Sequence, residues 1–261
     1  ELDLGARALE VESLGEFLGR LIDGVIDLGA VEFGDDVKTV VGHAHIVDHG
    51  VMHHPRAILF DLDRTLVDLQ SFTDYARALQ DLTDLVGAGV HAEVPDADWD
   101  APTLSTMAIL VALAGDSRWS EASDLVAAHE RAAISRSVAM PGLARIDEEL
   151  RGLPRAVVTL LPETVARATL HHHGIDMDVI VGRDPLIPAK PSGAGLVVAA
   201  QSLGVPVDQT VMIGDSSWDH AAAMDAGAAF IGVPVTEHAF GPGVAVAPSL
   251  LSALRRARDG S

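Results

Sequence analysis

The sequence contains no cysteine and only two lysines among its 261 residues. The absence of cysteine excludes disulfides, cysteine-ligated zinc, iron–sulfur clusters and a thiol nucleophile. Positive charge is scarce, because 18 basic residues face 38 acidic ones and the formal net charge is −20. A chain with this excess of negative charge repels phosphate backbones, so we expect no nucleic-acid partner.

Long apolar runs are also missing from the sequence. No run approaches the roughly 18 apolar residues of a membrane-spanning helix, so we expect no membrane association. The first residues lack the basic stretch and apolar run of a secretory signal, which favours a cytoplasmic protein. The hydrophobic content of 48% is that of a globular chain, and the length allows one or two domains.

Residues 1–55 have a pattern of their own. Apolar residues at helical spacing between Leu14 and Ile26 predict an amphipathic helix that ends near Gly29. An extended segment is predicted at 37–47, and a histidine-rich linker follows it. We interpret this part as an N-terminal extension that packs on the core, self-associates or docks a partner.

Strands and helices alternate over most of the remaining chain. One buried strand is predicted at 57–60, and four more are predicted near 155–160, 178–182, 210–214 and 228–233. Helices are predicted near 163–173, 193–203 and 217–226. This alternation predicts an α/β fold with a Rossmann-like parallel sheet that is covered by helices on both faces.

A helical block interrupts the alternation between the first and second strands. It contains predicted helices near 71–87, 103–114 and 120–138, with Ser71, Thr103 and Ser120 as N-caps. The block is far too long for a simple crossover, so we expect residues 69–143 to form an inserted helical cap. The core then comprises residues 56–68 and 144–261.

Two aspartates follow the first predicted strand directly, in the stretch FDLDRTL. Ligands of open α/β sheets bind at the carboxyl ends of the strands, which is where Asp61 and Asp63 stand. Two carboxylates at this spacing can divide the work, one as a nucleophile and the other as a proton carrier. A divalent cation between them would relieve their repulsion. A pair of turn-forming aspartates is the alternative for this motif taken alone.

A second acidic motif, GDSSWD, follows the fourth predicted strand and contains Asp215 and Asp219. Oxygen ligands at strand ends suit Mg²⁺ better than a transition metal, although Asp219 has the alternative role of stabilising the next helix start. Lys190 is the only lysine after residue 38, and its ammonium can hold a phosphoryl group or neutralise carboxylates. Thr159 ends the second predicted strand, and its hydroxyl can donate to a phosphate oxygen.

Together, FDLDRTL, Thr159, Lys190 and GDSSWD resemble the four motifs of the haloacid dehalogenase (HAD) superfamily, over residues 56–235. The helical block resembles the C1-type cap of the phosphoglycolate phosphatase and β-phosphoglucomutase-like members. The resemblance implies a Mg²⁺-dependent phosphomonoester hydrolase that acts on a small phosphorylated metabolite. It also implies the strand order 5-4-1-2-3 in the core sheet.

The resemblance implies a role for each motif residue. Asp61 would attack phosphorus to form an aspartyl-phosphate, and Asp63 would protonate the leaving oxygen and then activate water. Thr159 and Lys190 would hold the transferring phosphoryl group. The metal would be held by Asp61, the backbone carbonyl of Asp63 and Asp215, with support from Asp219.

Two alternatives to a phosphatase stay open: a phosphomutase, which returns the phosphoryl group to a sugar, and a non-catalytic binding module. The presence of Asp63 excludes a haloacid dehalogenase, and the absence of lysine from 69–143 excludes a Schiff-base phosphonoacetaldehyde hydrolase. Arg64 occupies a position that is often Gly in the family. Its side chain could reach the phosphate or the cap, or point to solvent, and we favour the last. Four cap side chains could contact the non-phosphate end of a substrate, but we expect each of them to be structural: Tyr75, Arg77, Arg118 and Trp119.

Overall fold

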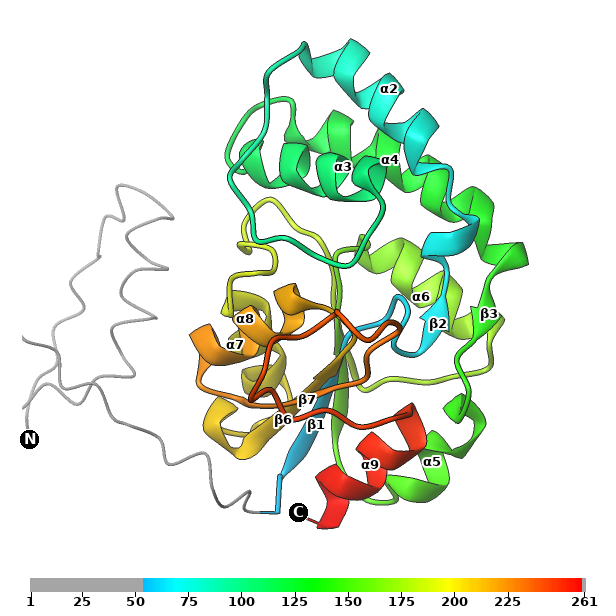
Figure 1. Cartoon of the computed structure of the whole chain (residues 1–261), viewed down its shortest axis with the longest axis vertical. Helices are drawn as coiled ribbons and strands as arrows, with labels where there is room; N and C mark the ends of the chain where they lie inside the picture. The colour runs from blue at the N-terminus through cyan, green and yellow to red at the C-terminus, as the bar shows by residue number, and fades with distance from the viewer. Residues whose placement is uncertain (1–53, 260–261) are drawn as a thin grey trace, which may run out of the picture. The chain divides into compact units, whose positions relative to one another are not determined.

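The structure, a computed structural model, describes residues 54–259. The helix and extended segment predicted within 1–55 therefore lie outside the described residues. Five parallel strands form the main sheet in the order β5-β4-β1-β6-β7 (Figure 1). If the five strands of this sheet are numbered along the chain, their order is 3-2-1-4-5. This is the predicted order 5-4-1-2-3 read from the opposite edge of the sheet. The strands are β1 (Ala57–Phe60), β4 (Arg155–Val158), β5 (Val179–Val181), β6 (Thr210–Gly214) and β7 (Ala229–Gly232).

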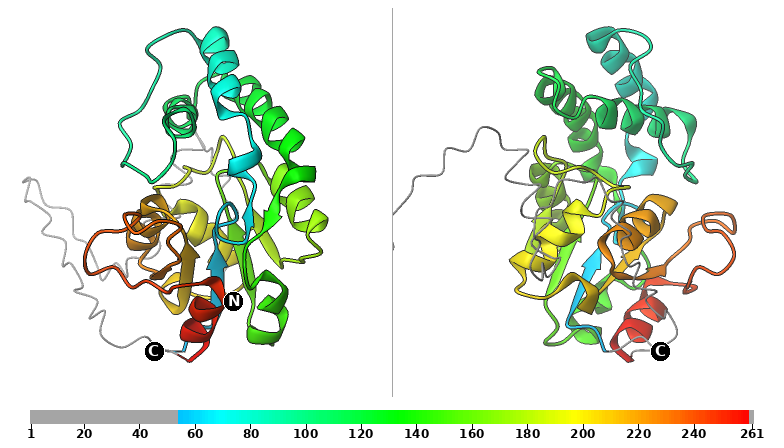
Figure 2. Two further views of the ribbon diagram at one scale, coloured as in Figure 1. Left: turned by 45° about the vertical axis from the view of Figure 1, so that its right-hand side comes forward. Right: turned by 90° about the vertical axis from the view of Figure 1, so that its left-hand side faces the viewer.

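Alternate side chains of each strand enter different apolar layers, as the two-residue period of a strand requires. In β1, Ile58 and Phe60 pack in the layer formed with the two helices that cover one face, and Leu59 packs in the opposite layer. The first face is covered by α6 (Glu163–His172) and α9 (Leu250–Asp259). The second is covered by α7 (Ala194–Ser202) and α8 (Ser217–Ala226), as the views in Figure 2 show. The prediction of a sheet covered on both faces is confirmed.

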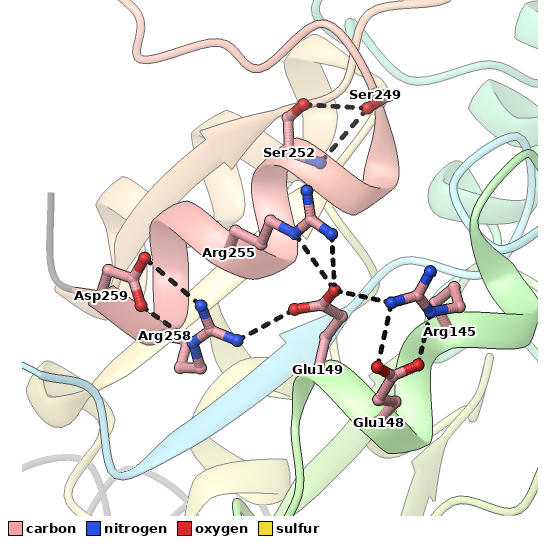
Figure 3. Close-up of polar contacts among 8 residues, drawn as sticks. All are labelled: Arg145, Glu148, Glu149, Ser249, Ser252, Arg255, Arg258 and Asp259. Carbon is pink, nitrogen blue, oxygen red and sulfur yellow. Dashed lines mark hydrogen bonds and ion pairs between the residues drawn. The ribbon is translucent and has the colours of Figure 1, made fainter.

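The C-terminal helix α9 was not predicted, and an arginine cluster joins it to α5 (Ile146–Glu149) (Figure 3). Glu149, which is buried, accepts hydrogen bonds from Arg255 Nε at 3.1 Å and from Arg258 Nη1 at 2.9 Å. The Arg145 guanidinium lies 3.6 Å from the same carboxylate. These contacts join α5 to α9 at the end of the sheet opposite the cap (Figure 1), far from the strand ends that carry the motif aspartates.

The predicted helical cap is present between β1 and β4, above the carboxyl ends of the strands in Figure 1. It contains α2 (Tyr75–Val86), α3 (Ala101–Ala112) and α4 (Trp119–Ala133), which share an apolar cluster separate from those of the core. The chain enters and leaves the cap through two short antiparallel strands, β2 (Val67–Asp68) and β3 (Val138–Ala139). Short 3-10 helices complete the described chain: η1 (Gln70–Phe72), η2 (Ile134–Arg136), η3 (Leu143–Arg145) and η4 (Val207–Gln209).

The predicted N-caps of the cap helices are wrong. The N-caps are Asp74, Asp100 and Arg118 in place of Ser71, Thr103 and Ser120. The aspartates accept from the backbone N–H three residues later, which a carboxylate does at least as well as a hydroxyl. The third cap helix ends at Ala133 rather than near residue 138, because the chain turns there into η2 and β3. Within the described part of the chain, no helix has both the length and the apolar character to cross a membrane.

Candidate active site

Asp61 lies directly beyond β1 and is held in line with the sheet. Its backbone N–H donates to the Ile213 carbonyl of β6 at 2.9 Å, so the strand ladder fixes the position of its Cα atom. Its side chain is almost completely buried, and Oδ1 accepts from Lys190 Nζ at 2.6 Å. Burial raises the pKa of Asp61 to about 7, against the opposing effect of the Lys190 ammonium. A bound cation would counter this cost of burying the charge.

Asp63 lies two residues further along the loop, beside the entrance to the cap at Leu69 and Gln70. Its Oδ1 accepts two backbone hydrogen bonds, from Leu69 and Gln70, each at 2.9 Å. Burial nevertheless raises the pKa of Asp63 to about 7. A carboxyl group with this pKa can be protonated or ionised near neutral pH, which suits a general acid and base.

Arg64 occupies the left-handed backbone region, with φ of 60°. Glycine adopts this conformation without steric cost, whereas a residue with a side chain, such as this arginine, adopts it only rarely. The favoured prediction that Arg64 points to solvent is wrong, and the alternative that it reaches the cap is the one observed. Its Nη1 donates to the Asp98 carbonyl in the cap at 2.8 Å, and its Nε lies 3.5 Å from Asp215 Oδ2. Arg64 therefore connects the acidic site to the cap loop.

Asp215 and Asp219 follow β6 around the start of α8. Asp219 forms a capping box with Ser216, in which its Oδ2 accepts from the Ser216 backbone N–H at 3.1 Å and from its hydroxyl at 2.6 Å. The other oxygen, Oδ1, accepts from Lys190 Nζ at 2.6 Å. A Cβ atom on Gly214 would lie 2.5 Å from the Asp219 carboxyl carbon, so only glycine permits this approach. The predicted alternative role of Asp219 at the helix start is thus present together with the Lys190 contact.

Three buried carboxylates meet at this point. One oxygen each of Asp61, Asp215 and Asp219 lies within 4.8 Å of the others. Burial, together with the Asp61 and Asp219 charges, raises the pKa of Asp215 well above its ordinary value. Burial lowers the pKa of Lys190, but Asp219 and Asp61 outweigh it and raise that pKa. Lys190 contacts Asp61 and Asp219, and Arg64 lies 3.5 Å from Asp215, so the carboxylates still outnumber the cations. This oxygen-rich group fits a hard divalent cation such as Mg²⁺.

Thr159 stands across the site, one residue beyond β4. Its backbone N–H donates to the Val181 carbonyl at 3.0 Å, and its Oγ1 accepts from the Leu161 N–H at 3.2 Å. The hydroxyl proton of Thr159 therefore remains available for a ligand. The structure thus brings all six predicted site residues to one edge of the sheet. The Asp63 carboxylate differs from the others because it bonds to the backbone of the loop that leads into the cap.

A cavity lies between these residues and the cap. The core side of its lining includes Asp61, Asp63, Thr159, Lys190 and Asp215. The cap side, which we call the cap face, consists of Gln70, Tyr75, Trp99, Thr103 and Met107. Of the four cap side chains expected to be structural, Tyr75 also lines this cavity. The other members of the cap face were missed, because helical spacing alone does not distinguish a side chain over a cavity from one in a core.

The cap loop that precedes α3 is docked on the core by Trp218. This side chain is completely buried in the apolar cluster of the cap although it belongs to α8 of the core. Its Nε1 donates to the Pro95 carbonyl at 2.8 Å, and its ring centroid lies 5.1 Å from that of Trp99. These contacts attach the cap loop to α8, the helix that also carries Asp219.

Comparison with known proteins identifies the class to which this fold and site belong. Residues 55–227 match the model of the haloacid dehalogenase-like hydrolase family. The chain therefore belongs to that family, and the expectation of a HAD-like hydrolase is confirmed. Among curated proteins, the phosphoglycolate phosphatase of Rhodospirillum rubrum is 34% identical over 209 residues, which cover 72% of this chain and 80% of the relative.

Solved structures agree with this assignment at the level of the fold. A hydrolase from Pseudomonas syringae superposes with a TM-score of 0.61 and 22% identity, covering 78% of this chain and 99% of its own. CbbY from Rhodobacter sphaeroides, solved in complex with phosphate, superposes with a TM-score of 0.58 and 22% identity, covering 76% and 95%. The predicted Rossmann-like core with its parallel sheet is confirmed.

Proposed function

We propose that this protein is a Mg²⁺-dependent phosphomonoester hydrolase that works through an aspartyl-phosphate intermediate on a small phosphorylated metabolite. The observation that carries the proposal is the position of Asp61. Its buried carboxylate lies at a strand end, 2.6 Å from the Lys190 ammonium and within 4.8 Å of two further carboxylates. Phosphoryl transfer depends mainly on positioning and charge neutralisation, and this arrangement supplies both.

In the proposed reaction, one Asp61 oxygen attacks phosphorus while the bond to the leaving oxygen breaks. Asp63 donates a proton to that oxygen, and the alcohol leaves. Asp63, now ionised, takes a proton from water, which attacks the aspartyl-phosphate and releases inorganic phosphate. The pKa of about 7 for Asp63 supports both proton transfers near neutral pH.

The remaining site residues would hold the phosphoryl group and the metal. Thr159 donates its hydroxyl proton and Lys190 its charge to the phosphoryl oxygens. A Mg²⁺ ion, when bound, would neutralise further charge on the phosphoryl group. Asp61, Asp215 and the backbone carbonyl of Asp63 are the groups that we assign to hold it. Asp219 has both oxygens engaged by Lys190 and Ser216, so we assign it to positioning Lys190.

The relatives and the charge of the chain support the proposed class of substrate. The R. rubrum relative bears the name phosphoglycolate phosphatase, so 2-phosphoglycolate is the reference substrate. The net charge of −20 favours small metabolites over nucleic acid. A cytoplasmic location, and self-association or partner docking through residues 1–55, remain predictions from the sequence.

Release of inorganic phosphate from a panel of phosphomonoesters tests this proposal. We expect release with Mg²⁺, none with a chelator, and a loss of at least a thousandfold in Asp61→Asn. Asp84→Asn removes the same charge from an exposed position of α2 and should leave the rate unchanged. Formation of an isomerised sugar phosphate would instead indicate a phosphomutase. A folded protein that releases no phosphate and isomerises no sugar would indicate a binding module.

A further inference from the structure

The cap face of the cavity carries no charged side chain. Its hydrogen-bonding side chains are Gln70, Tyr75, Thr103 and the indole of Trp99, and Lys190 is the only cation among the described residues that line the cavity. The Lys190 ammonium already contacts Asp61 and Asp219. Since the leaving group of a substrate must occupy the space between the phosphoryl site and the cap, these polar groups are the ones it meets.

A buried arginine sets the hydrogen-bonding direction of this face. Arg183, beyond β5, uses its five N–H donors on five acceptors, four of them on α4 of the cap. Two of these bonds form a bidentate pair with Glu130, at 3.1 and 3.2 Å, and Glu130 is completely buried. The fifth goes to the Leu160 carbonyl, next to Thr159, at 2.8 Å. The Glu130 carboxylate is therefore fixed relative to both the cap and the phosphoryl site.

Tyr75 therefore offers only a hydrogen-bond acceptor to the cavity. Its hydroxyl lies 3.3 Å from Glu130 Oε1. A carboxylate that accepts from a guanidinium has no proton to offer, so Tyr75 must be the donor in this bond. Burial and the Glu130 charge raise the pKa of Tyr75 well above its ordinary value, so the phenol keeps its proton. Only the lone pairs of Tyr75 Oη remain for a group in the cavity.

Thr103 is presented as a free hydroxyl. The residue is 2% exposed and lines the cavity, yet its Oγ1 has no hydrogen-bond partner among the described residues. Its backbone N–H is already taken by the Asp100 carboxylate at 2.8 Å. Buried polar groups in proteins are nearly always paired, so this unpaired hydroxyl beside the cavity is free to bond to a ligand atom.

We propose that Tyr75 and Thr103 form a leaving-group subsite that binds a hydroxyl, so that the enzyme prefers phosphomonoesters of small neutral diols or polyols to those of hydroxy acids. A hydroxyl can donate to Tyr75 Oη and accept from Thr103 Oγ1 at the same time. A carboxylate has no proton for Tyr75, and it adds negative charge to a cavity lined by three aspartates. This inference rests on the proposed phosphatase function, and it separates this chain from the relative named for phosphoglycolate.

Two substrates of nearly equal size test the inference directly. 2-Hydroxyethyl phosphate and 2-phosphoglycolate differ only in a CH₂OH group against a carboxylate. We expect kcat/KM of the wild type to favour 2-hydroxyethyl phosphate about tenfold or more, since a site built for a hydroxyl rejects a partner that cannot pair with it. Thr103→Val, which keeps the shape of the side chain, and Tyr75→Phe should each reduce this ratio severalfold. The reduction should come from a lower kcat/KM for 2-hydroxyethyl phosphate.

The ratio distinguishes recognition from a structural role. A side chain that only supports the fold would lower kcat/KM for both substrates equally. Thr103→Val removes a hydroxyl without a protein partner, so its melting temperature should match or exceed that of the wild type. Asp84→Asn in the same cap is the control and should keep the wild-type ratio.

Two results would overturn the inference in distinguishable ways. A wild-type preference for 2-phosphoglycolate, or equal losses on both substrates in the variants, would refute the subsite and leave the phosphatase function intact. Arg64, which lies near Asp215, would then be the cation to test for carboxylate binding. Failure to hydrolyse either substrate or p-nitrophenyl phosphate with Mg²⁺ would refute the phosphatase function and the subsite together.

Discussion

Removing the Arg183 guanidinium should be one of the most destabilising single substitutions in the described part of this protein. The Arg183 side chain is 3% exposed, and the Glu130 side chain is not exposed at all. Arg183→Met would leave a buried carboxylate with only the Tyr75 hydroxyl as a partner. Breaking a buried pair in this way costs about 3–5 kcal/mol. At about 2–4 °C per kcal/mol for a domain of this size, the melting temperature should fall by about 6–20 °C.

A surface arginine provides the matched control. Arg167 pairs with Glu163 at 2.6 Å along α6, with the two side chains 62% and 56% exposed. Exposed helix pairs of this kind contribute about 0.3–0.5 kcal/mol, so Arg167→Met should change the free energy of unfolding very little. The contrast between two identical substitutions isolates the effect of burial from that of losing an arginine.

Urea unfolding followed by tryptophan fluorescence is a suitable assay. Trp99 and Trp218 form a ring contact between the cap loop and the core, so they report on cap docking as well as on unfolding. A double variant, Arg183→Met with Glu130→Leu, removes both charges and should be more stable than Arg183→Met alone. Together with the single variant Glu130→Leu, it completes the double-mutant cycle that gives the coupling energy of the pair. If Arg183→Met lost no more stability than Arg167→Met, the reasoning about this buried pair would be refuted.

Three further predictions concern the metal, the acid range and the close approach at Gly214. Mg²⁺ at about 100 times its Kd should raise the free energy of unfolding by about 2.7 kcal/mol, measured by calorimetry. Asp215→Asn should abolish this increase, and an equal increase in the variant would show that the ion binds elsewhere. Hydrogen bonding from Arg255 lowers the pKa of Glu149. The Glu149 carboxylate therefore stabilises the fold at any pH above the ordinary pKa of a glutamate. This stabilisation is lost as the pH falls through the lowered pKa. Glu149→Gln should therefore unfold at lower urea concentration than wild type at pH 7, with a smaller difference in acid, whereas exposed Glu148→Gln should show little change. Gly214→Ala should displace Asp219 and reduce phosphate release at least tenfold, and wild-type rates in this variant would contradict the need for that approach.

The strand ends that carry the site could be predicted because their signals are local. An apolar run such as that of β1 is buried on both faces of a parallel sheet, and the residue after it must emerge at the edge of that sheet. Asp61, Thr159 and Asp215 each follow such a run, so their convergence needed no knowledge of side-chain packing. The boundaries of the cap helices were less predictable, since Asp74 and Asp100 compete with nearby Ser and Thr for the same capping role.

Contacts across long sequence separations were beyond the reach of the sequence. Arg64 looked like a solvent-facing residue, but the cap folds back and supplies the Asp98 carbonyl as its acceptor. Likewise Trp218 belongs to a core helix and is buried in the cap cluster. Neither partner lies within the window over which helical or strand periodicity operates.

The sequence by itself determined the α/β core, the inserted helical cap and the edge of the sheet at which the motif residues meet, because periodic burial and strand direction depend on neighbours along the chain. Only the tertiary structure decided how the leaving-group side of the cavity is built. Arg183, Glu130 and Tyr75 are more than 50 residues apart in sequence where they bond, and the Thr103 hydroxyl has no hydrogen-bond partner among the described residues. Hydrogen-bonding direction inside a cavity depends on which distant groups the cap brings against the core, and no local pattern encodes that.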